Sequence, residues 1–172
     1  HYSEIAKIID HKMGFIFPGF YAKFLIFNAN LEFRYYQDDF MPAYFDQLYD
    51  EQRAYIDGDS VFIKEKMLED ATESKGWFGS LTSNILNFIQ LTVSYEDMYG
   101  KEKEKNVKSI WGKASFNQKV LPKLTKAELN YSQTRFDKLR YLRTPSTLLD
   151  GVVGYSVSDN TLLVVKYQER YR

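Results

Sequence analysis

The feature that most constrains this chain is an alternation of apolar and polar residues with a period of two. From Leu25 to Tyr36 the odd-numbered residues are apolar, and the even-numbered ones between the two ends carry amide or charged groups. Because alternate side chains of a strand point to opposite faces of its sheet, this pattern predicts a strand with one apolar and one polar face. A helix would mix the two sets of side chains, so a strand is expected.

The alternation recurs along the chain and predicts consecutive antiparallel hairpins. Turn-forming residues separate the segments at Asp10–Lys12, Pro122–Lys123, Pro145–Ser146 and Ser158–Asn160, and at Gly100 with the charged run that follows it. The predicted strands cover residues 2–9, 14–37, 77–99, 107–121, 124–136, 148–158 and 160–171.

One long segment, residues 38–76, interrupts this order. Residues 43–56 carry side chains at helical spacing, and Asp57–Asp59 end this predicted helix. Residues 61–71 are expected to form a second short helix or an added strand. An excursion of this length is normal beyond the rim of a barrel, whereas a structureless loop of this length is unusual inside a compact domain.

Composition restricts the classes of function. The length fits one domain, residues 1–172, and 23 basic with 23 acidic residues argue against a nucleic-acid partner. The absence of Cys excludes a disulfide scaffold and a thiolate metal site. No apolar run approaches the roughly 20 residues of a transmembrane helix. The chain begins with His1 and shows no signal-peptide pattern, as expected of a processed or partial product.

Alternation alone fits a soluble sandwich or barrel with an apolar interior, or a transmembrane barrel with lipid outside. Three features favour the transmembrane barrel. Several predicted strands have ten or more residues, about the length that a tilted strand needs to cross a bilayer. The polar face carries both signs at mid-strand, as in Glu32 with Arg34. Aromatic residues, 17% of the chain, gather near strand ends, where Tyr and Trp would meet a membrane–water interface.

On residues 24–36, 85–99, 110–121, 127–134 and 162–171, the sequence resembles bacterial outer-membrane β-barrel proteins. The resemblance implies an all-β, antiparallel up-and-down transmembrane β-barrel of about eight strands, or part of a larger barrel, in the outer membrane of a Gram-negative envelope. An eighth strand is expected within 61–71 if the barrel closes alone. The long segment 38–76 then forms a partly helical loop at one rim.

The two faces of the strands supply the candidate site residues. The predicted lumen-lining residues are Asn28, Asn30, Glu32, Arg34, Lys126, Glu128 and Lys166. The predicted lipid-facing residues are Leu25, Phe27, Ala29, Leu31, Phe33, Leu91, Val93, Leu129 and Val165. In a barrel of about eight strands, the polar set is expected to fill the interior as a charge-paired plug, whereas in a wider barrel it would select solutes.

The expected function is non-enzymatic and porin-like in the broad sense: envelope structure, binding of a protein partner through 38–76, or passive solute passage. The lipid bilayer is the expected partner, and no cofactor is predicted. The alternative is a soluble lipocalin-like barrel that binds an apolar ligand inside.

Two local patterns are weighed for chemistry, and neither predicts a catalytic residue or a metal site. His11 lies in a turn, and it would be the base of a barrel-borne lipid hydrolase only beside a serine and an acid. Residues 57–60 have the oxygen spacing that begins a calcium loop. The pattern then fails, because Phe62 stands where glycine is required and Leu68 where a bidentate acid is required.

Overall fold

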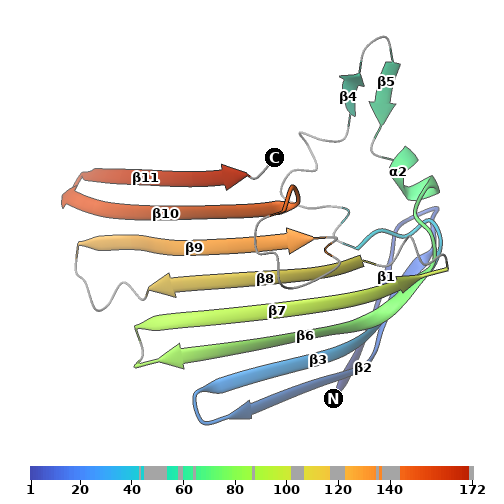
Figure 1. Cartoon of the computed structure of the whole chain (residues 1–172), viewed down its shortest axis with the longest axis horizontal. Coiled ribbons are helices and arrows are strands. Elements are labelled where there is room, and N and C mark those ends of the chain that lie inside the picture. Colours follow the sequence, from blue (N-terminus) through green and yellow to red (C-terminus); the bar gives the residue numbers. More distant parts are fainter. Residues whose placement is uncertain are drawn as a thin grey trace. The chain divides into compact units, whose positions relative to one another are not determined.

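The computed structural model describes residues 1–42, 44, 54–57, 60–63, 65–86, 88–101, 107–116, 123–134, 136 and 144–170. Within these ranges the chain forms a nine-stranded antiparallel sheet, a separate two-stranded hairpin and a helix of one turn (Figure 1). The strands of the main sheet follow one another in chain order. The prediction of an all-β, up-and-down antiparallel architecture is therefore confirmed.

The main sheet has the order β1-β2-β3-β6-β7-β8-β9-β10-β11, with β1 and β11 at its two ends. Its strands are β1 (Tyr2–Lys7), β2 (Met13–Phe24), β3 (Phe27–Tyr36), β6 (Ser74–Ile85), β7 (Ile89–Gly100), β8 (Val107–Phe116), β9 (Leu124–Thr134), β10 (Thr147–Ser158) and β11 (Thr161–Arg170). Among the residues that the structure describes, the sheet is not closed into a ring, because β1 and β11 are not neighbours.

Two segments that the sequence predicts as single strands each form two strands in the structure. Residues 14–37 form β2 and β3, and residues 77–99 form most of β6 and β7. The sequence gives no turn signal between β2 and β3, where the chain reverses at apolar residues, and only one turn-forming residue, Asn87, between β6 and β7. Leu25 and Leu86 take the left-handed conformation, each with φ 50°, in positions where glycine, Asn or Asp is usual. These two reversals divide the seven predicted segments into nine strands, which roughly fits the expected number of about eight.

The long segment 38–76 contains two short strands and a short helix. Strands β4 (Ala54–Asp57) and β5 (Ser60–Ile63) pair as a hairpin outside the main sheet, and helix α2 (Lys66–Glu69) follows. The strand expected within 61–71 thus exists in part as β5, but it does not join the main sheet. Most of the helix predicted over 43–56 lies outside the described residues, and its last three residues belong to β4 instead.

The chain divides into two compact units. Unit 1 comprises His1–Gly19, Glu32–Trp77 and Met98–Asn106, and unit 2 comprises Phe20–Leu31, Phe78–Asp97 and Val107–Arg172. The division passes through β2, β3, β6 and β7, so that each unit holds one end of these strands. Both units are therefore built from the same continuous hairpins.

Unit 1 has a small aromatic core. Tyr36, Phe40 and Met98 are buried together, with Ile8 packed against them, and the Tyr36 and Phe40 rings lie 5.5 Å apart. Gly14 makes room for this cluster, because a Cβ atom added there would lie 2.3 Å from the Phe40 ring. A larger residue at position 14 would displace that ring.

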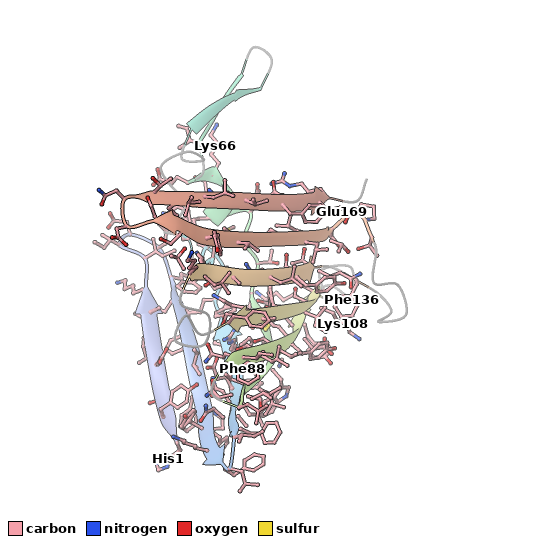
Figure 2. The ribbon with its side chains drawn as sticks, turned by 90° about the vertical axis from the view of Figure 1, so that its left-hand side faces the viewer. His1, Lys66, Phe88, Lys108, Phe136 and Glu169 are labelled. Carbon is pink, nitrogen blue, oxygen red and sulfur yellow. The ribbon has the colours of Figure 1, made fainter. Side chains whose placement is uncertain are left out.

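Unit 2 contains the strands β8 to β11, each of which pairs with the next. At one end of β8 the chain returns at Phe136, whose N–H donates to the Lys108 carbonyl at 3.4 Å (Figure 2). The Phe136 ring is buried and lies 6.4 Å from the ring of Tyr95. Gln133 and Thr147, paired across β9 and β10, are also buried at this end.

The reversal at Leu25 leads to a prediction about stability. Leu25→Gly is expected to raise the free energy of unfolding by about 0.5–1 kcal/mol, because glycine adopts positive φ without the steric cost that leucine bears. The Leu25 side chain is 91% exposed and contributes little by packing. The matched control is Leu31→Gly inside β3, which should lower the same quantity. Chemical unfolding monitored by circular dichroism measures both, and equal losses in the two variants would contradict the prediction.

Candidate functional site

The register of β8 to β11 assigns every side chain of these strands to one of two faces. Residues directly opposite one another share a face. Leu129 lies opposite Ala114 and Gly151, whereas its neighbour Asn130 lies opposite Lys113 and Asp150. The apolar face comprises Ile110, Gly112, Ala114, Phe116, Ala127, Leu129, Tyr131, Leu149, Gly151, Val153, Tyr155, Leu163, Val165 and Tyr167, and at one end it also carries Lys108, Gln133, Thr147 and Glu169. The polar face comprises Lys113, Ser115, Lys126, Glu128, Asn130, Ser132, Asp150, Lys166, Gln168 and Arg170, together with Trp111, Leu148, Val152, Gly154 and Val164.

The apolar face is open to its surroundings. Leu129 is 49% exposed, Val153 47% and Val165 58%, although all three lie in the middle of paired strands. A shallow depression on this face is lined by residues of all four strands, among them Ala114, Leu129 and Val153. The charged residues on this face are Lys108, near the start of β8, and Glu169, near the end of β11. Among the described residues, no second layer of secondary structure buries these side chains.

In the second half of β10 the polar face is less exposed than the apolar face, and contacts between side chains hold the polar face together. Val152 and Gly154 on this face are less exposed than Val153 and Tyr155 on the other. The Glu128 carboxylate forms ion pairs with two lysines. Lys113 Nζ lies 3.6 Å from Glu128 Oε1, and Lys126 Nζ lies 3.4 Å from Glu128 Oε2.

Beside this cluster, the Asn130 amide donates to Asp150 Oδ2 at 2.9 Å. A polar face with this many satisfied groups can lie away from bulk water.

A second polar cluster lies in unit 1, around Glu32. This side chain is buried, and its Oε2 atom accepts Arg34 Nε at 2.7 Å and Arg34 Nη2 at 2.6 Å. The Tyr2 hydroxyl donates to the other oxygen, Oε1. A buried carboxylate is costly unless it is paired and hydrogen-bonded, and here both of its oxygens have partners.

The predicted lumen-lining residues are thus distributed over both units. Glu32 and Arg34 pair in unit 1, whereas Lys126 and Glu128 pair in unit 2. Asn28 accepts a hydrogen bond from the Tyr21 hydroxyl at 3.1 Å, and Asn30 is half-buried. Lys166 lies on the polar face of β11 and is exposed. The sequence did not reveal Tyr2 or Asp150 as partners, because only the strand register brings them to these clusters.

The predicted lipid-facing residues differ in exposure. Leu31, Leu91, Val93, Leu129 and Val165 are exposed, and Phe27, Ala29 and Phe33 are half-buried. The Phe33 ring packs edge-on against Trp77, with centroids 5.1 Å apart. Leu25, predicted as a lipid-facing residue within a strand over residues 14–37, lies in the β2–β3 turn instead.

A cluster of charged residues lies just outside the strands of unit 1. Asp38 accepts the Glu73 backbone N–H at 2.6 Å and the Lys101 ammonium at 3.3 Å, and Lys101 also reaches Glu73 Oε2 at 3.1 Å. The hydrogen bond from the Glu73 backbone, followed by that from Lys101, lowers the pKa of Asp38. The hydrogen bonds to Glu73 and Asp38 raise the pKa of Lys101. This cluster ties the segment after α2 to the ends of β3 and β7.

His11 has an acidic partner. Its Nε2 atom lies 3.7 Å from Glu65 Oε1, and its backbone N–H closes a turn onto the Ile8 carbonyl. Among the described residues, no serine hydroxyl is bonded to His11. The structure therefore does not assemble the serine, histidine and acid that a hydrolase would need at this position.

No family model, curated protein or solved structure matches the chain. Within the described ranges, no helix has both the length and the apolar character to cross a membrane. The same ranges hold no group of three or more His, Asp or Glu side chains that could bind a metal ion.

The Asp38 cluster leads to a prediction about pH. The folded pKa of Asp38 lies below its unfolded value of about 3.9, so its stabilisation is present above that pH and is lost as pH falls through the folded pKa. Asp38→Asn should therefore lower the unfolding midpoint at pH 6, and the difference from the wild type should shrink at acid pH. Asp159→Asn, in the exposed β10–β11 turn, is the control. A difference that stays constant from pH 6 to pH 2 would contradict the prediction.

Proposed function

We propose that this chain is an integral outer-membrane β-sheet protein that places its apolar face against lipid and its polar face toward an interior. One observation carries the proposal. Along β10, the apolar Val153 and Tyr155 are exposed, while the opposite face is less exposed and adjoins paired charges of β9. A water-soluble sheet normally does the reverse, with its apolar side packed on a core.

The energetics favour an apolar environment for the exposed face. Fully removing a Val or Leu side chain from water contributes about 1.5–3 kcal/mol, and the apolar face of β8 to β11 carries many such groups. Hydrocarbon would cover them without a second protein layer. The backbone groups between these strands are already satisfied by the antiparallel ladders, as a lipid environment requires.

Strand length supports the same proposal. Strands β2, β6, β7 and β10 have 12 residues each, and β8 has 10. Soluble strands usually have about five or six residues, whereas a tilted membrane strand needs about 9–11. Aromatic side chains are also placed at strand ends, for example Trp77 near the start of β6 and Tyr99 near the end of β7. There they would meet the headgroup region.

The proposed role is non-enzymatic. The Glu128 and Glu32 clusters hold their own charges together, and this favours an interior filled by paired side chains over one that selects solutes. We propose that residues 38–76 lie at a rim, where the hairpin β4–β5 and helix α2 offer a surface for a protein partner. Envelope structure, partner binding and passive passage are the roles that fit this arrangement.

A soluble, lipocalin-like barrel remains the second candidate because of the depression on the apolar face. In that arrangement an apolar ligand would lie against Leu129 and Val153. The two proposals differ in which face meets water, so variants that distinguish the faces also distinguish the proposals.

The first test is the response to detergent and heat. The membrane proposal expects the folded protein to need detergent for solubility and to migrate differently in electrophoresis when heated and unheated samples are compared. A stable monomer in detergent-free buffer would overturn the proposal and favour the soluble barrel.

The second test compares two adjacent valines on opposite faces of β10. Val153→Arg is expected to reduce the folding free energy in lipid bilayers by about 2–4 kcal/mol, if residue 153 lies near mid-bilayer. Val152→Arg should be tolerated, because position 152 lies opposite Glu128. Folding into vesicles, followed by tryptophan fluorescence, measures both variants. A greater loss for Val152→Arg would contradict the proposal.

A further inference from the structure

Two neighbouring turns of unit 2 carry apolar side chains that are open to the surroundings. Phe24, Leu25 and Ile26 at the β2–β3 turn are exposed, and so is Leu86 at the β6–β7 turn. In this up-and-down sheet both turns lie at the same end (Figure 1). The Asn84 backbone N–H donates to the Ile26 carbonyl at 3.2 Å and joins the two turns. These four apolar residues form what we call the apolar tip.

Leucine at positions 25 and 86 carries a backbone cost that packing within the chain does not offset. Both residues have φ 50°, a conformation that a Cβ atom disfavours and that Gly, Asn or Asp usually adopts. Leu25 is 91% exposed and Leu86 76%, so neither side chain gains much from contacts inside the molecule. Strained residues of this kind gather at binding sites, where another interaction stabilises them. The two leucines therefore indicate that an apolar partner covers the tip.

The segments that form the apolar tip are almost without charge. Residues 78–95 contain no Asp, Glu, Lys or Arg, and residues 13–31 contain only Lys23. The β10–β11 turn lies at the same end of the sheet and is different, because it carries the exposed Asp159 and Asn160. Turns that face water usually have such polar residues. The composition of the apolar tip is therefore that of a buried surface.

We propose that the apolar tip inserts into the surface of a phospholipid bilayer, with Lys23 at the level of the lipid phosphates. Residues 24, 25 and 26 are consecutive and all exposed, so apolar side chains leave this turn in several directions. Fluid acyl chains cover such a projection without a complementary shape. Lys23 is also exposed, and a lysine beside apolar residues can extend its ammonium group to the interface while its methylene groups remain among acyl chains.

The same charge pattern disfavours a second copy of this chain as the occupant. Most dimers are two-fold symmetric, so that the same surface of each copy meets the other. Such a contact would bring the Lys23 side chains of both copies together, and neither residues 13–31 nor residues 78–95 contain an acid. Lipid phosphates carry the negative charge that Lys23 attracts. The inference does not require the strands to cross the bilayer, because a soluble sheet could also bind a bilayer through this tip.

A fluorescent probe on the full chain tests the proposal. The chain has no Cys, so a single cysteine carries the probe. Ile26→Cys places it at the apolar tip and keeps both leucines, and Asn160→Cys places it in the polar turn at the same end. With vesicles of phosphatidylcholine and phosphatidylglycerol, we expect blue-shifted emission at position 26, quenching by a nitroxide on the lipid, and little quenching by aqueous iodide. At position 160 we expect the reverse.

Variants in the Ile26→Cys background separate side chain from backbone. Leu25→Asn/Leu86→Asn keeps residues that readily adopt positive φ but removes the apolar groups. This variant should retain the circular dichroism of the parent, lose quenching by the lipid nitroxide and gain quenching by iodide. Lys23→Glu should act in the same direction, and more strongly as the proportion of phosphatidylglycerol rises. Lys123→Glu, in the turn before β9 at the same end, is the matched control and should leave both signals unchanged.

Three results would overturn the proposal. Equal iodide quenching at positions 26 and 160 would show that the tip lies in water. Shielding of position 26 from both quenchers would identify a protein surface as its occupant. Unchanged lipid quenching in Leu25→Asn/Leu86→Asn would show that the leucines do not hold the tip in lipid.

A probe at Val153→Cys, on the apolar face of β10, distinguishes this proposal from the proposed function. Lipid quenching at position 153 but not at position 26 would refute the tip and leave the lipid-facing sheet supported. Lipid quenching at position 26 but not at position 153 would support the tip and refute the lipid-facing sheet.

Discussion

The pairing of β9 with β10 keeps Leu129 opposite Gly151 and Glu128 opposite Val152, and both faces of unit 2 depend on that register. Side chains alternate with a period of two, so a slip of one residue would exchange the faces of a whole strand. Glu128 would then lie among Ala114 and Val153, and its two lysines would lose their partner. The cost of that misplaced charge is what makes the register specific, because the ladder of backbone hydrogen bonds alone would tolerate the slip.

Paired carboxylates reinforce this specificity in both units, where Glu32 is buried and Glu128 is half-buried. Glu32 is held by Arg34 on its own strand and by Tyr2 from β1, whereas Glu128 is held by Lys126 on its own strand and by Lys113 from β8. In each case one partner is two residues away and the other comes from another strand. The local partner is available before the sheet forms, but the second requires the correct pairing. Removing either cross-strand partner would leave an incompletely satisfied acid on the less exposed side of the sheet.

The sequence predicted the faces well and the turns less well. Alternation placed Asn28 to Arg34 on one face because side-chain direction in a strand depends only on parity. It merged β2 with β3, and β6 with β7, because Leu25 and Leu86 are not turn-forming residues and their positive φ is imposed by the pairing of the flanking strands. Contacts between distant residues, such as Tyr2 with Glu32 and Lys101 with Asp38, were beyond prediction, because they depend on the register and on the path of residues 38–76.

The acidic and basic residues of the polar face are unevenly distributed over the strands β8 to β11. From β8 to β10 the acids have partners: Glu128 meets two lysines and Asp150 meets Asn130. On β11 the polar face adds Lys166 and Arg170 but no acid, and the opposing positions of β10 are apolar. The net positive charge of this face therefore lies on β11, where both cations are exposed. An exposed cation keeps most of its hydration and tolerates the lack of a carboxylate, whereas a buried carboxylate such as Glu32 must be paired.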